Sequence, residues 1–505
     1  MRRFATVVAA ASLLTLAACG GKTDEGSRAA GITPVSAIAF VSVNLDPSID
    51  QKRNLLGIAR RFPGAGDSVR GEFDEARDGL LADLVEGTGL DFERDVEPWL
   101  GNEVALAVLP PANGGDPSAV ALVETDDAGQ ARAALDKAAQ EGFEGSYQVI
   151  GDFVVIVDED DAGAEQATLA RVAAQAEKDD GGLAESEAFT GVVDELAGDR
   201  LVLGWVDARK ALDLAGDLSG FDFGPLAQFG SQATTMAFDL HAERSALVFQ
   251  AVALSEAEAT GRQPELTRGL PAATLAALTL FDVGTGVTDG IRALAGVDGD
   301  DVLGGFEEQT GIDLEGDILS WMGGELVVVV GPVAEGRSFP DAALVVEPSD
   351  RARAEQGVAR VRQALADQGL ELDERVVAGA GAHVAAQPLA EGVQPAMALF
   401  PDRFVLATSP AYLEELAGGS GPTLAGTDAY SDVLGDESGD GTTMQLVVLI
   451  DPVREAVEQV VLNDPDDRST YEADVKPNLE PLSAFGIVAR QDGDLGRVSV
   501  RLTFD

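Results

Sequence analysis

Acidic side chains recur at fixed spacing in two stretches of this chain, and they are its first candidates for chemistry. Residues 89–108 read GLDFERDVEPWLGNEVALAV, and residues 311–330 read GIDLEGDILSWMGGELVVVV. The stretches align without a gap at an offset of 222 residues. Eight positions are identical: Gly89/Gly311, Asp91/Asp313, Glu93/Glu315, Asp95/Asp317, Trp99/Trp321, Gly101/Gly323, Glu103/Glu325 and Val108/Val330. The shared pattern is Asp-x-Glu-x-Asp-x-x-x-Trp-x-Gly-x-Glu.

Two interpretations fit these repeated acids. Carboxylates are the ligands that hard cations prefer, so the pattern makes Asp91, Asp95, Asp313 and Asp317 weak candidates for a calcium or magnesium site. In the alternative, the first Asp caps a short helix, the Trp plugs its end and the Gly turns the chain into the next strand. We favour the structural interpretation, because an element present in both copies belongs to a fold more often than to one site. The structural repeat then comprises Trp99, Gly101, Glu103, Trp321, Gly323 and Glu325.

Few other residues offer catalytic chemistry. The chain has two histidines: His241, expected in a hairpin turn, and His383, in a Gly/Ala-rich strand region. Neither has a partner at metal-ligand spacing, and the sequence contains no G-x-S-x-G motif and no P-loop. We therefore predict no enzyme, no catalytic residue and no cofactor beyond weak Ca²⁺ association. The alternative is a hydrolase with a carboxylate pair about 5–9.5 Å apart in a cleft between lobes.

The first eighteen residues have the features of an export signal. Met1-Arg2-Arg3 is cationic, residues 4–16 are apolar apart from Thr6, Ser12 and Thr15, and the run ends in Leu16-Ala17-Ala18-Cys19. This ending resembles the lipobox of bacterial lipoproteins, in which the cysteine takes acyl chains such as palmitate and the leader is removed. Cys19 is the single cysteine of the chain. The alternative is an ordinary signal peptide with an incidental cysteine.

These features predict a lipoprotein signal peptide over 1–18, lipidation at Cys19 and a polar, flexible tether over 19–30. The protein would then be exported and anchored by lipid to the cell membrane, on its extracytoplasmic side. Acyl chains supply about 0.8 kcal/mol per buried CH₂, so two or three of them hold firmly.

The strong negative charge of the chain excludes nucleic acid as a partner. The formal net charge is −52, and removal of Arg2 and Arg3 with the leader leaves 33 basic against 87 acidic residues, or −54. Such a field repels nucleic acid, which is bound mainly through Lys and Arg. It also repels anionic headgroups, so membrane attachment must come from the acyl chains. The remaining partners are an unknown envelope protein or a small ligand.

The duplication continues through the rest of the chain. Residues 116–140 are similar to 339–363, 151–170 to 401–418 and 185–212 to 426–457, and each half ends in an expected hairpin. We predict a first lobe over 31–258, a linker over 259–266 and a second lobe over 267–505. Each lobe is expected to be α+β, with a mainly antiparallel sheet and packed helices.

Local signals support this fold class. Asp126-Asp127 and Ser349-Asp350 precede Ala-rich segments with helical periodicity and are expected N-caps. Residues 103–109 and 119–124 are expected to pair as antiparallel strands. Residues 147–150 and 153–157 flank Gly151-Asp152, a tight-turn dipeptide.

One family resemblance adds to these observations. The Leu270-Pro271-Ala272-Ala273-Thr274 opening before a strand, the two-lobe length and the lipobox resemble the bacterial envelope family called domain of unknown function 3352. In the first lobe the opening is reduced to Ile32-Thr33-Pro34-Val35-Ser36. The resemblance implies the two-lobe envelope architecture and brings no activity or catalytic residues. The sequence thus predicts a non-catalytic binding or scaffolding lipoprotein, with a hydrolase in the inter-lobe cleft and a structural envelope spacer as alternatives.

Overall fold

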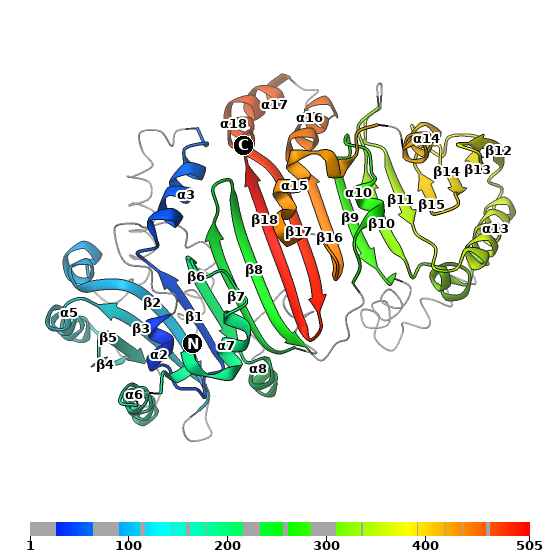
Figure 1. The fold of residues 1–505 in the computed structure, drawn as a ribbon. Coiled ribbons are helices and arrows are strands. Elements are labelled where there is room, and N and C mark those ends of the chain that lie inside the picture. The colour runs from blue at the N-terminus through cyan, green and yellow to red at the C-terminus, as the bar shows by residue number, and fades with distance from the viewer. Residues whose placement is uncertain are drawn as a thin grey trace. The chain divides into compact units, whose positions relative to one another are not determined.

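The protein divides into two compact units in its computed structural model (Figure 1). Unit 1 comprises Met1–Ala257 and Gly493–Val498, and unit 2 comprises Glu258–Asp492 and Ser499–Asp505. The division falls beside the expected linker 259–266. Gly493–Val498 groups with unit 1 and not with the second lobe as expected, and Ser255 N donates to Asp494 O at 2.7 Å. The structure describes residues 27–63, 90–111, 117–143, 145–157, 162–178, 180–215, 233–255, 261–283, 310–334, 337–390, 392–419, 421–437, 439–460 and 465–505.

Unit 1 is built on an antiparallel sheet with the strand order β4–β5–β3–β2–β1–β6–β7–β8. The strands are β1 (Ala39–Asn44), β2 (Leu100–Leu109), β3 (Ser118–Thr125), β4 (Ser146–Ile150), β5 (Phe153–Val157), β6 (Val202–Val206), β7 (Ala233–Ala242) and β8 (Ala246–Ser255). The two pairs expected from the sequence, β2 with β3 and β4 with β5, are confirmed. Gly151 adopts φ +60° in the β4–β5 turn, a conformation that glycine reaches without steric cost.

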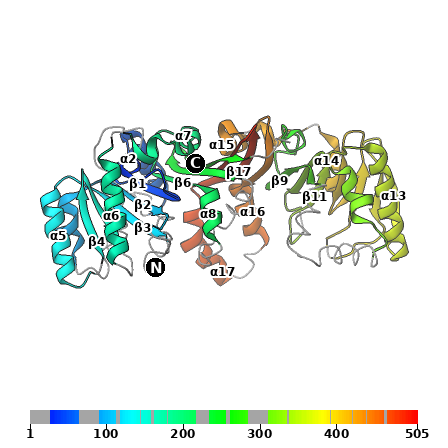
Figure 2. The same ribbon diagram turned by 90° about the horizontal axis from the view of Figure 1, so that it is seen from below.

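The helices of unit 1 cover both faces of its sheet. They are α2 (Arg28–Ile32), α3 (Ile49–Ala59), η2 (Phe92–Val96), η3 (Glu97–Trp99), α5 (Ala128–Gln140), α6 (Ala162–Ala176), η4 (Gly182–Glu185), α7 (Glu187–Val193) and α8 (Ala208–Ala215). Val154 of β5 packs with α5, whereas its neighbour Val155 shares a cluster with α6, so the two helices lie on opposite faces (Figure 2). Asp127 caps α5 as expected, accepting from Gly129 N and Gln130 N.

Unit 2 has its own antiparallel sheet, in the order β12–β13–β14–β15–β11–β10–β9–β16–β17. The strands are β9 (Ala276–Phe281), β10 (Glu325–Val330), β11 (Ala342–Val346), β12 (Leu372–Val377), β13 (Ala380–Ala385), β14 (Ala396–Leu399), β15 (Phe404–Ala407), β16 (Thr442–Leu449) and β17 (Leu482–Asp492). The last strand, β18, spans Leu495–Phe504, and near its end Thr503 Oγ1 accepts from Ala484 N of β17 at 3.0 Å.

Two apolar clusters join several helices of unit 2 to this sheet. The helices of the unit are α10 (Glu265–Arg268), η6 (Leu314–Ile318), η7 (Leu319–Trp321), α13 (Arg351–Asp367), α14 (Pro410–Gly418), η8 (Leu424–Gly426), α15 (Asp428–Leu434), η9 (Gly435–Glu437), α16 (Ile450–Val460), α17 (Pro465–Thr470), η10 (Tyr471–Val475) and α18 (Lys476–Leu479). Helices α14 and α15 pack on the larger cluster, whereas η7 and α13 pack on a second one with Phe404. Asp350 caps α13, as expected. The α+β class predicted from the sequence is therefore confirmed.

The folded body begins earlier than the sequence predicted. A flexible tether was expected over 19–30, but Ser27 caps helix α2, and Ala29 and Ala30 are fully buried. Ala29 and Ala30 carry no periodic apolar signal along the sequence, although their small size lets the helix approach the sheet closely. No helix in the described part of the chain is long and apolar enough to cross a membrane.

Candidate functional site

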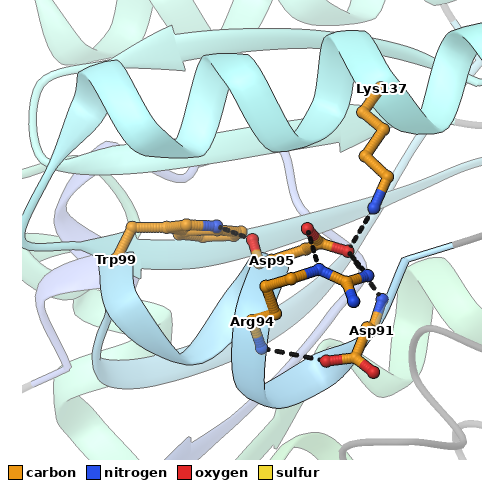
Figure 3. A network of polar contacts seen from close by, with 5 residues as sticks. All are labelled: Asp91, Arg94, Asp95, Trp99 and Lys137. Atoms are coloured by element: carbon orange, nitrogen blue, oxygen red, sulfur yellow. Dashed lines mark hydrogen bonds and ion pairs between the residues drawn. The ribbon is translucent and has the colours of Figure 1, made fainter.

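The first copy of the acidic motif forms a short capped helix in unit 1. Asp91 is the N-cap of η2, and its Oδ1 accepts from Arg94 N at 3.0 Å (Figure 3). Asp95 Oδ2 accepts in return from Asp91 N at 2.9 Å. This reciprocal arrangement works as a capping box does, because each carboxylate satisfies an N–H group that the helix leaves unpaired.

The second copy makes the same contacts in unit 2. Asp313 is the N-cap of η6 and accepts from Gly316 N at 3.0 Å, and Asp317 Oδ2 accepts from Asp313 N at 3.2 Å. Glu93 and Glu315, the middle acids of the two copies, are exposed. The first and third acids of each copy therefore accept hydrogen bonds from backbone N–H groups of their own short helix.

The repeated tryptophans fix each short helix to the body of its unit. Trp99 Nε1 donates to Asp95 O at 2.6 Å, and Trp321 Nε1 donates to Asp317 O at 2.9 Å. Both indoles are buried, and Trp321 stacks edge-on against Phe404 with ring centroids 5.6 Å apart. Each indole thus fills an apolar cluster with its rings and satisfies a helix carbonyl with its N–H.

Asp95 is the most strongly perturbed carboxylate of the motif. Hydrogen bonds from Arg94, from Lys137 and from the Asp91 N–H hold the pKa of Asp95 well below its usual range. Lys137 Nζ, reaching from α5, lies 2.5 Å from Asp95 Oδ2 (Figure 3). A cation bound by Asp91 and Asp95 would have to compete with these two positively charged side chains.

The final glutamate of each copy has a different role: it holds the first helix of its unit. Glu103 accepts from Ser27 Oγ and, at 3.0 Å, from Ala29 N, at the start of α2. Glu325 accepts from Leu266 N at 2.7 Å and from Thr267 N at 2.9 Å, at the start of α10. A carboxylate suits this position because helix N-termini carry a partial positive charge.

Both glutamates are buried, at 9% and 1% exposure for Glu103 and Glu325. Burial raises the pKa of each, and the charges of Glu124 and Glu347, respectively, raise it further. The hydrogen bonds from the helices act in the opposite direction. The pKa of each glutamate lies above its ordinary value, because burial outweighs the hydrogen bonds that the helix ends supply. These hydrogen bonds are a structural use of a buried acid.

The two repeated glycines occupy different places relative to the following strand. Gly101 was predicted to turn the chain into the following strand but lies inside β2, where an added Cβ would be 2.7 Å from Glu124 Cγ. Gly323 does precede β10, and its Cβ would be 3.1 Å from Ser349 Oγ. Close packing against a neighbouring segment, and not a turn, explains the glycine at position 101.

The two histidines lie in separate units. His241 was expected in a hairpin turn but occupies β7, where it is buried and its Nδ1 lies 2.7 Å from Asp239 Oδ1. Burial by itself lowers the pKa of His241, but the hydrogen bonds and charges of Asp239 and Glu243 raise it to about 9. His383 lies in β13 as expected, and burial lowers its pKa. Neither environment joins an imidazole to a nucleophile.

Within the described ranges, no group of three or more His, Cys, Asp or Glu side chains is arranged to hold a metal ion. The weak candidates Asp91, Asp95, Asp313 and Asp317 are placed as two separate capping pairs, one in each unit. The chemistry of these residues is hydrogen-bond acceptance from backbone N–H groups.

Several side chains that complete this structure were not predicted from the sequence. Arg28 Nη2 lies 2.7 Å from Asp152 Oδ2, and its Nη1 pairs with Glu124, so an arginine of the expected tether is part of the fold. Asp239 is fully buried beside His241. A period-two pattern, Asp239-x-His241 in a mostly apolar strand, was the available signal, because alternate strand residues share a face.

The comparisons with known proteins place the chain in a family. Two solved structures, crystal forms IV and III of TP0453, are similar over 48% and 47% of this chain and 93% of theirs, at 11% and 10% identity and TM-scores of 0.24 and 0.23. The curated proteins contain no match. The model of the family described as "Protein of unknown function (DUF3352)" matches residues 4–156 and 164–445, so this chain belongs to the DUF3352 family.

Proposed function

We propose that the mature protein is a lipoprotein held by acyl chains on Cys19 to the extracytoplasmic face of the cell membrane. The observation that carries this proposal is the Leu16-Ala17-Ala18-Cys19 sequence after an apolar leader, in a chain with one cysteine. The start of the folded body supports it. Seven residues separate Cys19 from Ser27, the N-cap of α2, so acyl chains on the cysteine would be joined to the described fold by a short segment of chain.

We further propose that the body binds or scaffolds another envelope component and catalyses no reaction. The first and last acids of the repeated motif support this role, because they accept hydrogen bonds from backbone N–H groups of the protein itself. Asp91 and Asp313 cap short helices, and Glu103 and Glu325 hold α2 and α10. A carboxylate engaged by backbone N–H groups and kept from solvent is poorly placed to transfer a proton to a substrate.

The two units, on this proposal, are tandem copies of one α+β unit. The strand pairing supports this origin: β1 pairs with β2 and β6 in unit 1, and β9 pairs with β10 and β16 in unit 2. Beyond β2 the sheet of unit 1 continues with β3, β5 and β4, and beyond β10 the sheet of unit 2 continues equivalently with β11, β15 and β14. On the other side β7 follows β6, as β17 follows β16. The β12–β13 hairpin is an addition in unit 2. Equivalent Asp caps, Trp–carbonyl bonds and buried glutamates give further support.

The decisive experiment replaces the cysteine. Cys19→Ser should abolish incorporation of a labelled fatty acid and move the protein from the membrane fraction to the soluble extracytoplasmic fraction. Thr23→Ser, a conservative change in the same segment, serves as the control and should retain both properties. Membrane fractionation and labelling that are unchanged in Cys19→Ser would refute the anchor.

A further inference from the structure

Helix α2 is attached to the sheet of unit 1 by charged and polar contacts as well as by burial. Glu103 accepts from Ser27 Oγ and Ala29 N, while Arg28 pairs with Glu124 and with Asp152. The Arg28 guanidinium also lies 5.9 Å from the centre of the Phe153 ring. We call this set the α2 clamp; its acids are Glu103, Glu124 and Asp152.

The acids of the α2 clamp all lie at one end of the unit 1 sheet. Glu103 is near the start of β2 and pairs with Asn44, the last residue of β1. Glu124 is near the end of β3, where it pairs with Phe153, and Asp152 belongs to the β4–β5 turn. We call this end of the sheet the Glu103 end.

From this geometry we infer that the α2 clamp fixes where the lipid tether leaves the body, and so turns the Glu103 end of unit 1 toward the membrane. The inference rests on the proposed function, because it requires acyl chains on Cys19. The Glu103 end is then the membrane-facing surface of unit 1, and the residues of the α2 clamp determine it.

The number of residues between Cys19 and the first fixed point of the fold gives the maximum length of the tether with and without the clamp. Eight residue steps from Cys19 to Ser27 reach at most about 29 Å when fully extended. Without the clamp, the next fixed point is Thr33, whose carbonyl accepts from Leu183 N at 2.9 Å. The reach would then be fourteen steps, or about 50 Å. The clamp thus keeps the Glu103 end close to the bilayer, with much less freedom to turn away.

Two exposed positions can report this orientation. Asp126 follows β3 at the Glu103 end, and Glu141 follows the last turn of α5, the helix that runs toward the opposite end. The thirteen residues of α5 place these positions about 20 Å apart. Because Cys19 would carry the lipid, a cysteine introduced at 126 or 141 would be the single free thiol available for a dye.

The experiment uses full-length acylated protein in vesicles of a zwitterionic phospholipid, which avoid repulsion of the acidic surface. Energy transfer from the dye to an acceptor lipid should be at least about twofold more efficient from Asp126→Cys than from Glu141→Cys, given their separation along α5. Equal transfer, or stronger transfer from position 141, would overturn the inference. Protein recovered without acyl chains on Cys19 would instead refute the proposed function, so the two failures are distinguishable.

Variants of the α2 clamp test whether the clamp causes this orientation of unit 1. Arg28→Ala and Ala30→Glu should each increase hydrogen exchange at residues 29–33 and reduce the transfer ratio between the two positions. Arg53→Ala, which removes an equal charge from the exposed Arg53–Asp50 pair on α3, is the matched control and should leave the ratio unchanged. An unchanged ratio in a clamp variant whose residues 29–33 exchange freely would show that the clamp does not orient the body.

Discussion

Gly357 in helix α13 should tolerate no side chain, against the usual preference of helices for alanine. A glycine inside a helix normally costs about 0.5–1 kcal/mol relative to alanine, so Gly→Ala ordinarily stabilises. Here an added Cβ would lie 2.1 Å from Asp317 O and 2.6 Å from Trp321 Nε1. These two atoms are hydrogen-bonded to each other at 2.9 Å, so the methyl group would meet the bond that fixes the motif of unit 2.

The expected free-energy change follows from three contributions. Overpacking against backbone costs about 1–3 kcal/mol. Loss of the Trp321–Asp317 hydrogen bond costs about 1 kcal/mol. The helix preference for alanine returns up to about 1 kcal/mol. We therefore expect Gly357→Ala to lower the free energy of unfolding of unit 2 by about 2 kcal/mol.

Tryptophan fluorescence during urea unfolding provides a unit-specific assay. Trp99 and Trp205 belong to unit 1, so the changes Trp99→Phe and Trp205→Phe leave Trp321 as the reporter of unit 2. In this background the Gly357→Ala midpoint should fall by about 1 M urea, for a slope near 2 kcal/mol per molar.

A matched glycine provides the control for this prediction. Gly418 is the last residue of α14 and has no atom within 4 Å of an added Cβ, so Gly418→Ala should be neutral or slightly stabilising. A Gly357→Ala protein as stable as its parent would show that α13 does not contact the motif this closely.

Three further predictions concern the buried indoles, the buried histidine and the motif lysine. Trp99→Ala and Trp321→Ala should each destabilise their own unit by about 3–5 kcal/mol in urea unfolding, because each hollows an apolar cluster; unaltered midpoints would contradict the burial of the indoles. The folded-state pKa of His241, about 9, exceeds the ordinary value of 6.5. Its stabilising contribution should therefore be complete below about pH 6.5 and disappear as the pH rises through 9, an effect of about 3 kcal/mol. Unfolding measured from pH 6 to 10 should show this decline, and His241→Gln should flatten it; an equal decline in the variant would assign the effect to another group. Lys137→Ala should cost at most about 1 kcal/mol, since its ammonium is partly exposed, and a larger loss in thermal unfolding would show that the pair with Asp95 is more than a surface contact.

Local features of this fold could be predicted because they depend on contacts between near neighbours in the chain. Asp127 and Asp350 cap helices through N–H groups two or three residues later. Asp91 and Asp313 do the same in the repeated motif, three residues apart. The Pro/Gly/Asn loop between residues 109 and 119 predicted the pairing of β2 with β3, and the Gly151-Asp152 turn predicted the pairing of β4 with β5.

Only the tertiary structure decided what the buried glutamates and the beginning of the fold do. Glu103 meets Ala29 across 74 residues of chain, and Glu325 meets Thr267 across 58. Arg28 finds Asp152 across 124 residues, which turns part of an apparently flexible segment into a helix attached to a sheet. Spacing along a sequence carries no information about such pairs, because the strands that bring them together must assemble first.

The sequence by itself therefore determined the duplicated motif, the helix caps, the α+β class and a candidate lipid site at Cys19. The packed fold decided that Gly101 serves close approach, that His241 is a buried ion-pair partner and that Ser27 starts the body. The physical reason is the range of the interactions. Backbone hydrogen bonds within a turn act locally, whereas burial of charge depends on every segment that excludes water from the site.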